Sequence, residues 1–131
     1  MSDYKKLQVW RKAHALALNA HRAATGIRGS QYAAFRSQII RAALSIPANI
    51  VEGREQKTEA AFARYLRIAL GSASELEYHV RAAHDIQAIS NGDYTSLSTQ
   101  VVEVRMMLHG LLRRLEAGTR TPEPATRKVH A

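Results

Sequence analysis

The sequence predicts an all-α protein, an antiparallel up-down four-helix bundle, and three observations support this prediction. Four segments carry apolar residues at steps of three and four, which is the period of a helix buried along one face. Only short stretches separate the segments, which favours antiparallel neighbours. No useful length of chain alternates apolar and polar residues as a β-strand does. The 131 residues fit one domain, with the bundle expected over residues 1–118 and a disordered basic tail over residues 119–131.

One apolar stripe predicts each of the first two helices. The first helix is expected to end at Gly26 and Gly29, because glycine often follows a helix C-terminus. Its stripe consists of Trp10, Ala13, Ala17, Ala20, Ala24 and Ile27. The second helix is expected from about Tyr32 to Gly53. Its stripe consists of Phe35, Ile39, Ala42, Ile46 and Ile50.

The third helix is predicted to start after Thr58, a residue type that caps helix N-termini, and to continue to about Ile89. Its stripe consists of Phe62, Tyr65, Ala69, Ser72 or Ala73, Leu76, Val80 and Ala83. Gly71 lies inside this helix, where glycine costs about 1 kcal/mol relative to alanine, so we expect a close helix crossing there. A turn over residues 90–93 precedes the fourth helix, which is expected to end before Gly118. Its stripe consists of Leu97, Val101, Val104, Leu108, Leu111 and Leu115.

The second helix carries a further apolar stripe, which consists of Ile40, Leu44, Pro47 and Val51. This stripe is rotated by roughly 100–120° from the first one on a helical wheel. A bundle helix normally buries one stripe, so the second stripe predicts a subunit interface. The alternative is a broad core-facing side that the loop over residues 26–31 closes. Pro47 lacks an N–H and crowds the carbonyl of Ala43, so the helix either kinks or breaks there, and the unbroken phase of the first stripe favours a kink.

Three strings of residues give the chain a family resemblance. They are Leu7–Ala13, Ser37–Gly53 and Phe62–Glu77, in that order. The chain resembles the four-helix bundle proteins encoded in intervening sequences of bacterial large-subunit ribosomal RNA genes. The resemblance implies a ring-like homopentamer. It also implies kinship with the accessory protein of diversity-generating retroelements, a basic pentamer that binds nucleic acid and a reverse transcriptase.

The sequence contains few of the residue patterns that enzymes use for catalysis. The chain has no cysteine, which excludes thiolate metal sites, and no Glu lies three residues before a His, as a di-iron bundle requires. Glu75 and His79 offer only two metal ligands. We therefore expect no catalytic residue, no metal and no cofactor. No apolar run approaches the roughly 18 residues of a membrane span and no signal peptide is evident, so we expect a cytoplasmic protein without membrane contact.

Three polar residues lie where the helices are expected to be partly buried: Asn49, Glu52 and Glu75. The structural interpretation is a polar network that fixes the Pro47 kink or the subunit contact. In this network, the carbonyl freed by the proline and a partner arginine satisfy Asn49 and Glu52. The alternative interpretation is a ligand-binding role.

The positive charge of the chain is concentrated in its first half. Residues 1–51 hold eight basic side chains and one acid, whereas residues 52–118 hold eight basic and nine acidic side chains. A basic surface attracts a polyanion. The candidate nucleic-acid-binding residues are Arg11, Lys12, Arg22, Arg28, Arg36 and Arg41. The sequence thus predicts a non-enzymatic homo-oligomer that binds nucleic acid, most plausibly structured RNA, and the alternative is a protein-interaction scaffold whose charge keeps it soluble.

Overall fold

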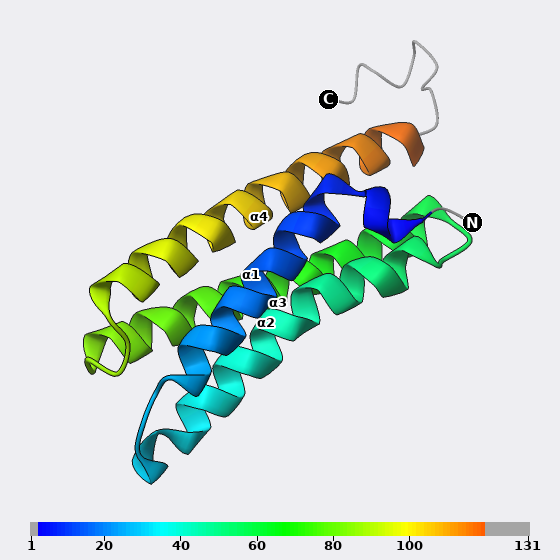
Figure 1. Ribbon diagram of the computed structural model, residues 1–131. Helices are drawn as coiled ribbons and strands as arrows, with labels where there is room; N and C mark the ends of the chain where they lie inside the picture. The colour runs from blue at the N-terminus through cyan, green and yellow to red at the C-terminus, as the bar shows by residue number, and fades with distance from the viewer. Residues whose placement is uncertain (1–2, 120–131) are drawn as a thin grey trace, which may run out of the picture.

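The computed structural model describes residues 3–119, and in that range it consists of helices joined by short connections (Figure 1). The helices are α1 (Gln8–Thr25), α2 (Ala33–Arg54), α3 (Glu59–Asp85) and α4 (Asn91–Thr119), with two 3-10 turns, η1 (Tyr4–Lys6) and η2 (Ser30–Tyr32). The described range contains no strand. The predicted all-α four-helix bundle is confirmed, while the expected tail lies, apart from Thr119, outside the described residues.

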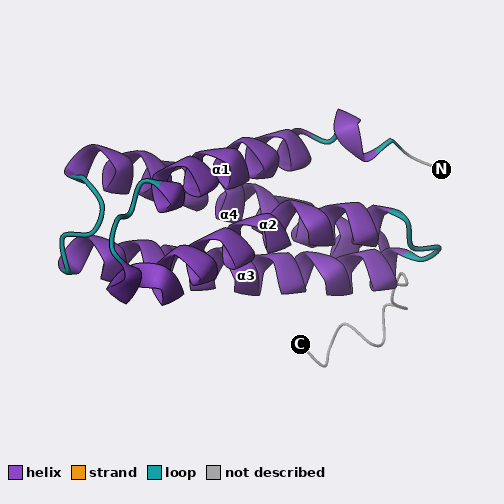
Figure 2. Cartoon of the chain, turned by 60° about the horizontal axis from the view of Figure 1, so that its bottom comes forward, coloured by secondary structure: helices purple, strands orange, loops and turns teal. Residues whose placement is uncertain are grey.

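Side-chain contacts show how neighbouring helices run past one another. Arg41 of α2 reaches Glu75 of α3, and Ser45, one turn further along α2, reaches Ser72, one turn earlier on α3. The two helices therefore run in opposite directions. The same progression holds between α1 and α4 for the pairs Lys12–Glu103 and Arg22–Asp93. The connections lie at the two ends of the bundle (Figure 2).

The core follows most of the apolar stripes that the sequence predicts, but Trp10, Phe35 and Tyr65 are only half-buried, Leu16 and Leu66 are buried in addition, and the phase changes on α4. Leu97, Val101, Val104 and Leu108 are buried, but the next buried residue is Leu112 rather than Leu111, which is half-buried together with Leu115. A straight helix turns once in 3.6 residues, so a step of four after Leu108 keeps the side chain on the core side.

The connection between α3 and α4 is longer and the helix limits differ from the prediction. Helix α3 ends at Asp85 rather than near Ile89, and Gln87 in the connection has a φ of +63°. The Ser90 Oγ accepts a hydrogen bond of 3.0 Å from the Asp93 amide, which caps the start of α4. The predicted turn residues therefore form the first turn of α4, which also continues through Gly118.

Helices α2 and α3 approach each other closely at small residues. An ideal Cβ on Gly53 would lie 2.8 Å from Phe62 Cδ1 and 2.8 Å from Tyr65 Cβ, so only glycine fits there without movement. The Ser45 and Ser72 hydroxyls form a hydrogen bond of 2.7 Å across the same pair of helices. The close crossing expected at Gly71 is wrong, because a Cβ there would meet nothing within 4 Å.

Pro47 lies within α2 and is buried. The helix is continuous from Ala33 to Arg54, so it does not break into two pieces at the proline. The bend expected at this residue stays a prediction.

Candidate nucleic-acid interface

Arg22, one of the predicted cations with an acidic partner, belongs to a polar contact between α1 and α4. Its Nη2 lies 2.8 Å from Asp93 Oδ1 and also donates to Asn19 Oδ1 at 2.7 Å. The Asn19 amide donates in turn to Gln100 Oε1 at 2.6 Å. The contact balances the charge of Arg22 and leaves it a weak candidate for binding phosphate.

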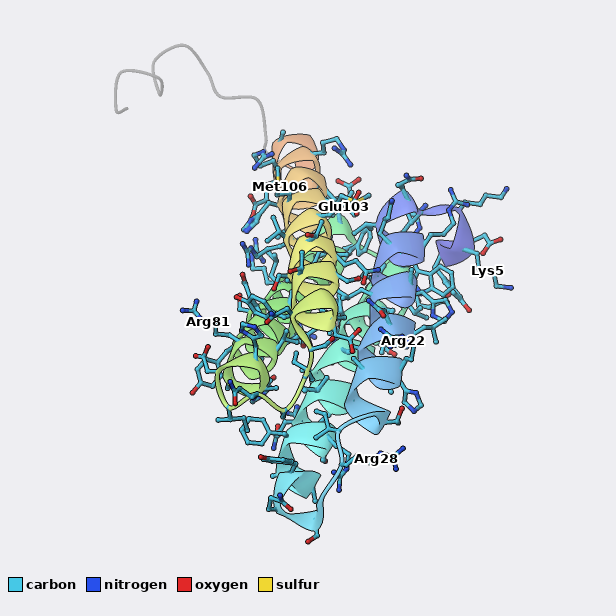
Figure 3. All side chains as sticks on the ribbon, turned by 60° about the vertical axis from the view of Figure 1, so that its left-hand side comes forward. Lys5, Arg22, Arg28, Arg81, Glu103 and Met106 are labelled. Carbon is cyan, nitrogen blue, oxygen red and sulfur yellow. The ribbon has the colours of Figure 1, made fainter. Side chains whose placement is uncertain are left out.

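Lys12 and Arg41 also have acidic partners. Lys12 Nζ lies 3.4 Å from Glu103 Oε2, on the side of α4 that faces α1 (Figure 3). Arg41 Nη2 donates to Glu75 Oε2 at 2.6 Å, between α2 and α3. Surface pairs of this kind contribute only about 0.2–1 kcal/mol to stability. Here each acidic partner cancels the positive charge of its cation, and the sequence alone does not show these pairs.

Glu75 connects α2 and α3, and its predicted part in fixing the Pro47 kink or a subunit contact stays a prediction. It accepts from Arg41 and lies 3.5 Å from His79 Nε2 on its own helix. The hydrogen bond from Arg41 lowers the pKa of the Glu75 carboxyl below its ordinary value of 4.5, against a smaller opposing effect of burial. The carboxylate is therefore the form that this contact favours.

Arg36 and Arg28 lie at the loop between α1 and α2. Arg36 Nη1 donates to the carbonyl oxygens of Ile27 and Gly29, each at 2.9 Å, and thereby holds the loop. Gly29 has a φ of +104°, a conformation that side chains disfavour. Arg28 is exposed at this end of the bundle, in the same loop that Arg36 holds (Figure 3).

Arg11 and Arg22 are both exposed, but the structure does not bring them together. Eleven residues separate them along α1, a distance of about 16 Å. Arg11 lies instead beside η1, where its Nη1 donates to the Lys5 carbonyl oxygen at 3.3 Å.

A different set of cations lies at the end of the bundle where α1 begins and α4 ends, and we call it the end cluster. Its members are Lys5, Lys6, Arg11, Arg113 and Arg114. Within residues 3–119, none of the five forms an ion pair. Of the acids at this end, Asp3 caps η1 and Glu116 pairs with Arg67 of α3 at 2.5 Å. Glu59 lies beside the last turn of α4, where its Oε1 would be 3.4 Å from a Cβ on Gly118. The end cluster is therefore positive charge that no ion pair among residues 3–119 cancels.

Sequence reasoning assigned Arg11 to the site but missed the other four members of this cluster. The available signal was the pair of dipeptides Lys5-Lys6 and Arg113-Arg114. In an up-down bundle of four helices, the start of the first and the end of the last lie at the same end. The predicted topology therefore already places the two dipeptides together.

A groove of about 380 Å³ lies between the start of α1 and the later turns of α4, beside Arg114 of the end cluster, and we call it the end groove. Its lining consists of Leu7, Gln8, Val9, Met106, Met107, Gly110, Leu111 and Arg114. Met106 is 67% exposed and lies on the outer side of α4 (Figure 3). An ideal Cβ on Gly110 would lie 3.7 Å from Arg114 Nη1 and 3.9 Å from Arg113 Nη2, so both guanidinium groups extend over this glycine.

The predicted interface stripe on α2 is only partly available to a second subunit. Leu44 is 49% exposed, whereas Ile40 and Val51 are half-buried. Pro47 is buried within its own chain, so its assignment to the interface is wrong. On α1, Leu18 is 56% exposed and adds a second large apolar side chain to the surface of the bundle.

The predicted network of Asn49 and Glu52 is wrong in two respects. Asn49 Nδ2 donates to the carbonyl oxygen and the Oγ of Ser45, at 2.8 and 3.0 Å, and not to the carbonyl that Pro47 leaves free. Glu52 is exposed, so it needs no buried partner. The polar contacts that do form between α2 and α3 include the Ser45–Ser72 pair and the Arg41–Glu75 pair.

Two properties of the described residues bear on other classes of function. Among residues 3–119, no three His, Asp or Glu side chains gather closely enough to hold a metal ion. In the same range, every helix is too short or too polar to span a lipid bilayer.

Comparison with known proteins identifies the family. The chain matches the family described as 23S rRNA-intervening sequence protein over residues 5–110. It is similar to the crystal structure of a protein of unknown function, from the S23 ribosomal protein family of Bacteroides thetaiotaomicron. The two share 27% sequence identity and a TM-score of 0.74, over 79% of this chain and 97% of the other. No curated protein matches the chain. The predicted resemblance is confirmed: the chain belongs to the 23S rRNA-intervening sequence protein family.

Proposed function

We propose that this protein binds nucleic acid, structured RNA above all, through the end cluster and without catalysing a reaction. The observation that carries the proposal is five cations at one end of the bundle without an acidic partner among residues 3–119. Cations grouped in this way repel one another, and a phosphate backbone relieves that repulsion while it releases condensed counterions. A cytoplasmic location, where structured RNA is made, is part of the proposal.

This binding is led by phosphate and reads little sequence. Arginine side chains form forked hydrogen bonds with phosphate oxygens, and three of the five members of the end cluster are arginines. Contacts to the backbone position a protein on nucleic acid but carry no sequence information. We therefore expect affinity for many structured RNAs and a weak preference among base-paired sequences.

Salt dependence separates this proposal from the protein-scaffold alternative. The test measures fluorescence anisotropy of a labelled RNA hairpin with the wild-type protein at several salt concentrations. Five phosphate contacts predict a loss of affinity by a factor of roughly 10²–10³ between about 50 and 200 mM salt. Absence of binding at low salt, or binding that does not change with salt, would overturn the proposal in favour of the scaffold.

We also propose that the protein is a homo-oligomer, with a pentamer favoured by the family resemblance. The supporting observation is the exposure of Leu18 and Leu44, two large apolar side chains on adjacent helices. Leu44→Glu places a charge in the proposed contact and is expected to give a smaller, folded species in light scattering. Val102→Glu on α4 is the matched control, because Val102 is also exposed and apolar. A wild-type monomer at micromolar concentration would contradict this proposal.

A further inference from the structure

We propose that the end groove accepts a single unpaired nucleobase of an RNA whose phosphates contact the end cluster. The inference rests on the proposed function and deepens it, because it names the feature of the RNA that the protein recognises. Its basis is a groove with aliphatic and thioether side chains and the Arg114 guanidinium in its lining: the lining takes a flat ring, and the cations nearby take the backbone that carries it.

The lining of the end groove has the chemistry that a base requires. Leu7, Val9, Met106, Met107 and Leu111 provide aliphatic and thioether surface. Methionine sulfur makes favourable contacts with aromatic rings. Arg114 adds a planar guanidinium group to the same lining, and unpaired bases stack on such groups. The volume of about 380 Å³ lies within the range of small-ligand sites.

The exposure of Met106 explains why an occupant is favoured. This side chain is 67% exposed, although the groove beside it is apolar. Covering such a side chain with a ring removes apolar surface from water and is stabilising. A base inside a stem is stacked between its neighbours, whereas a base in a bulge or loop can turn outward and enter the groove.

The charge around the groove favours a nucleotide over other occupants. Lys6 directly precedes Leu7 on one side of the groove, and Arg113 extends over Gly110 on the other side. Both lie where the phosphates on either side of an inserted base would pass. An acidic amphipathic helix also complements these charges, but it has no planar group to match the Arg114 guanidinium, so we favour the base.

The test compares two labelled RNA hairpins that share one stem, one fully paired and the other with a single bulged adenosine. Wild-type protein is expected to bind the bulged hairpin roughly tenfold more tightly at the same salt concentration. Met106→Ser is expected to abolish this preference and to leave the affinity for the paired hairpin unchanged. Val102→Ser, an exposed change on α4 outside the groove lining, is the matched control and is expected to keep the preference.

A second variant tests the same inference by filling the groove. A Cβ on Gly110 meets the two guanidinium groups at ordinary contact distances, so Gly110→Leu is compatible with the fold. Its side chain is expected to occupy the groove and to remove the preference for the bulged hairpin. Far-UV circular dichroism checks that each variant remains helical.

The outcomes separate the failure of this inference from the failure of the proposed function. Equal affinity of wild type for both hairpins overturns the inference while RNA binding stands. Persistence of the preference in both Met106→Ser and Gly110→Leu overturns it as well. If an amphipathic helical peptide of leucine and glutamate binds, and Met106→Ser removes that binding instead, the groove is a protein-docking site and the inference is wrong.

Discussion

The contact between α2 and α3 and the contact between α1 and α4 are built in opposite ways. Between α2 and α3, Gly53 allows the helices to touch and the Ser45–Ser72 hydrogen bond lies partly buried between them. Between α1 and α4, the contact consists of long polar side chains such as Arg22 and Asp93, and it opens into the end groove. The first contact is closed at Gly53 and leaves only a smaller depression of about 200 Å³ near Phe35 and Tyr78, whereas the second opens into the end groove of about 380 Å³ with Arg114 in its lining.

This difference indicates where stability and function lie in the bundle. Close apolar packing is sensitive to a change of even one methylene, because interiors are as dense as molecular crystals. Solvated polar contacts are individually weak and tolerate change. We therefore expect substitutions between α2 and α3 to affect folding, and substitutions near the end groove to affect binding with little effect on folding.

The largest expected effect on stability is that of Gly53→Val. The new Cβ would lie 2.8 Å from Phe62 Cδ1 and from Tyr65 Cβ, so the two helices must move apart. Overpacking of this kind typically lowers the free energy of unfolding by about 1–3 kcal/mol. Urea denaturation measures it, and a variant as stable as wild type would show that the helices are not in close contact at Gly53.

Gly71→Ala is the counterpart of Gly53→Val, because it also adds a side chain at a helical glycine, but at one with open space around it. A Cβ there meets nothing within 4 Å, and alanine favours helix formation over glycine. We expect the free energy of unfolding to rise by up to about 1 kcal/mol. A loss of stability in the same denaturation experiment would indicate that another subunit covers this position.

The smallest expected effect is that of Glu75→Gln, which removes a charge from the exposed pair with Arg41. The folded-state pKa of Glu75 lies below its ordinary value of 4.5, so its contribution to stability is present above that value and is lost as the pH falls through the lowered pKa. Wild type is expected to exceed the variant by about 0.5 kcal/mol at neutral pH, with the difference vanishing in acid. Thermal unfolding across the acid range measures this, and a difference that grows as the pH falls would contradict the assignment.

The sequence predicts the fold well because the signals for a helix are local. The stripes Ile39–Ile50 on α2 and Phe62–Ala83 on α3 follow from spacing alone, and their residues are largely buried. Errors arise where the outcome depends on a neighbour. Spacing shows that Gly71 lies in a helix but not which side of that helix meets α2.

The candidate site is harder to predict, because its charges are assigned by contacts between residues far apart in the chain. Arg22 and Asp93 are separated by 71 residues, and their pairing depends on the relative shift of α1 and α4. If α4 were shifted by one turn along α1, Arg22 would lose its partner and Asp93 would lie beside a different residue. The number of positive charges is a property of the sequence, whereas the number left without a partner is a property of the packed helices.

The most direct test of the central claim compares two triple variants that remove the same net charge. One is Lys6→Gln with Arg113→Gln and Arg114→Gln, which removes cations without an ion pair. The other is Lys12→Gln with Arg22→Gln and Arg41→Gln, which removes cations that have acidic partners. The measurement is the salt dependence of binding to a labelled, fully paired RNA hairpin.

If the end cluster binds phosphate, the first variant loses about three units of slope in the plot of log affinity against log salt concentration, about one for each residue removed. Its affinity at low salt falls by at least about tenfold, while the second variant keeps most of the slope and affinity of wild type. Equal losses in the two variants would mean that only the total charge matters. A larger loss in the second variant would place the binding surface on the paired cations and contradict the account.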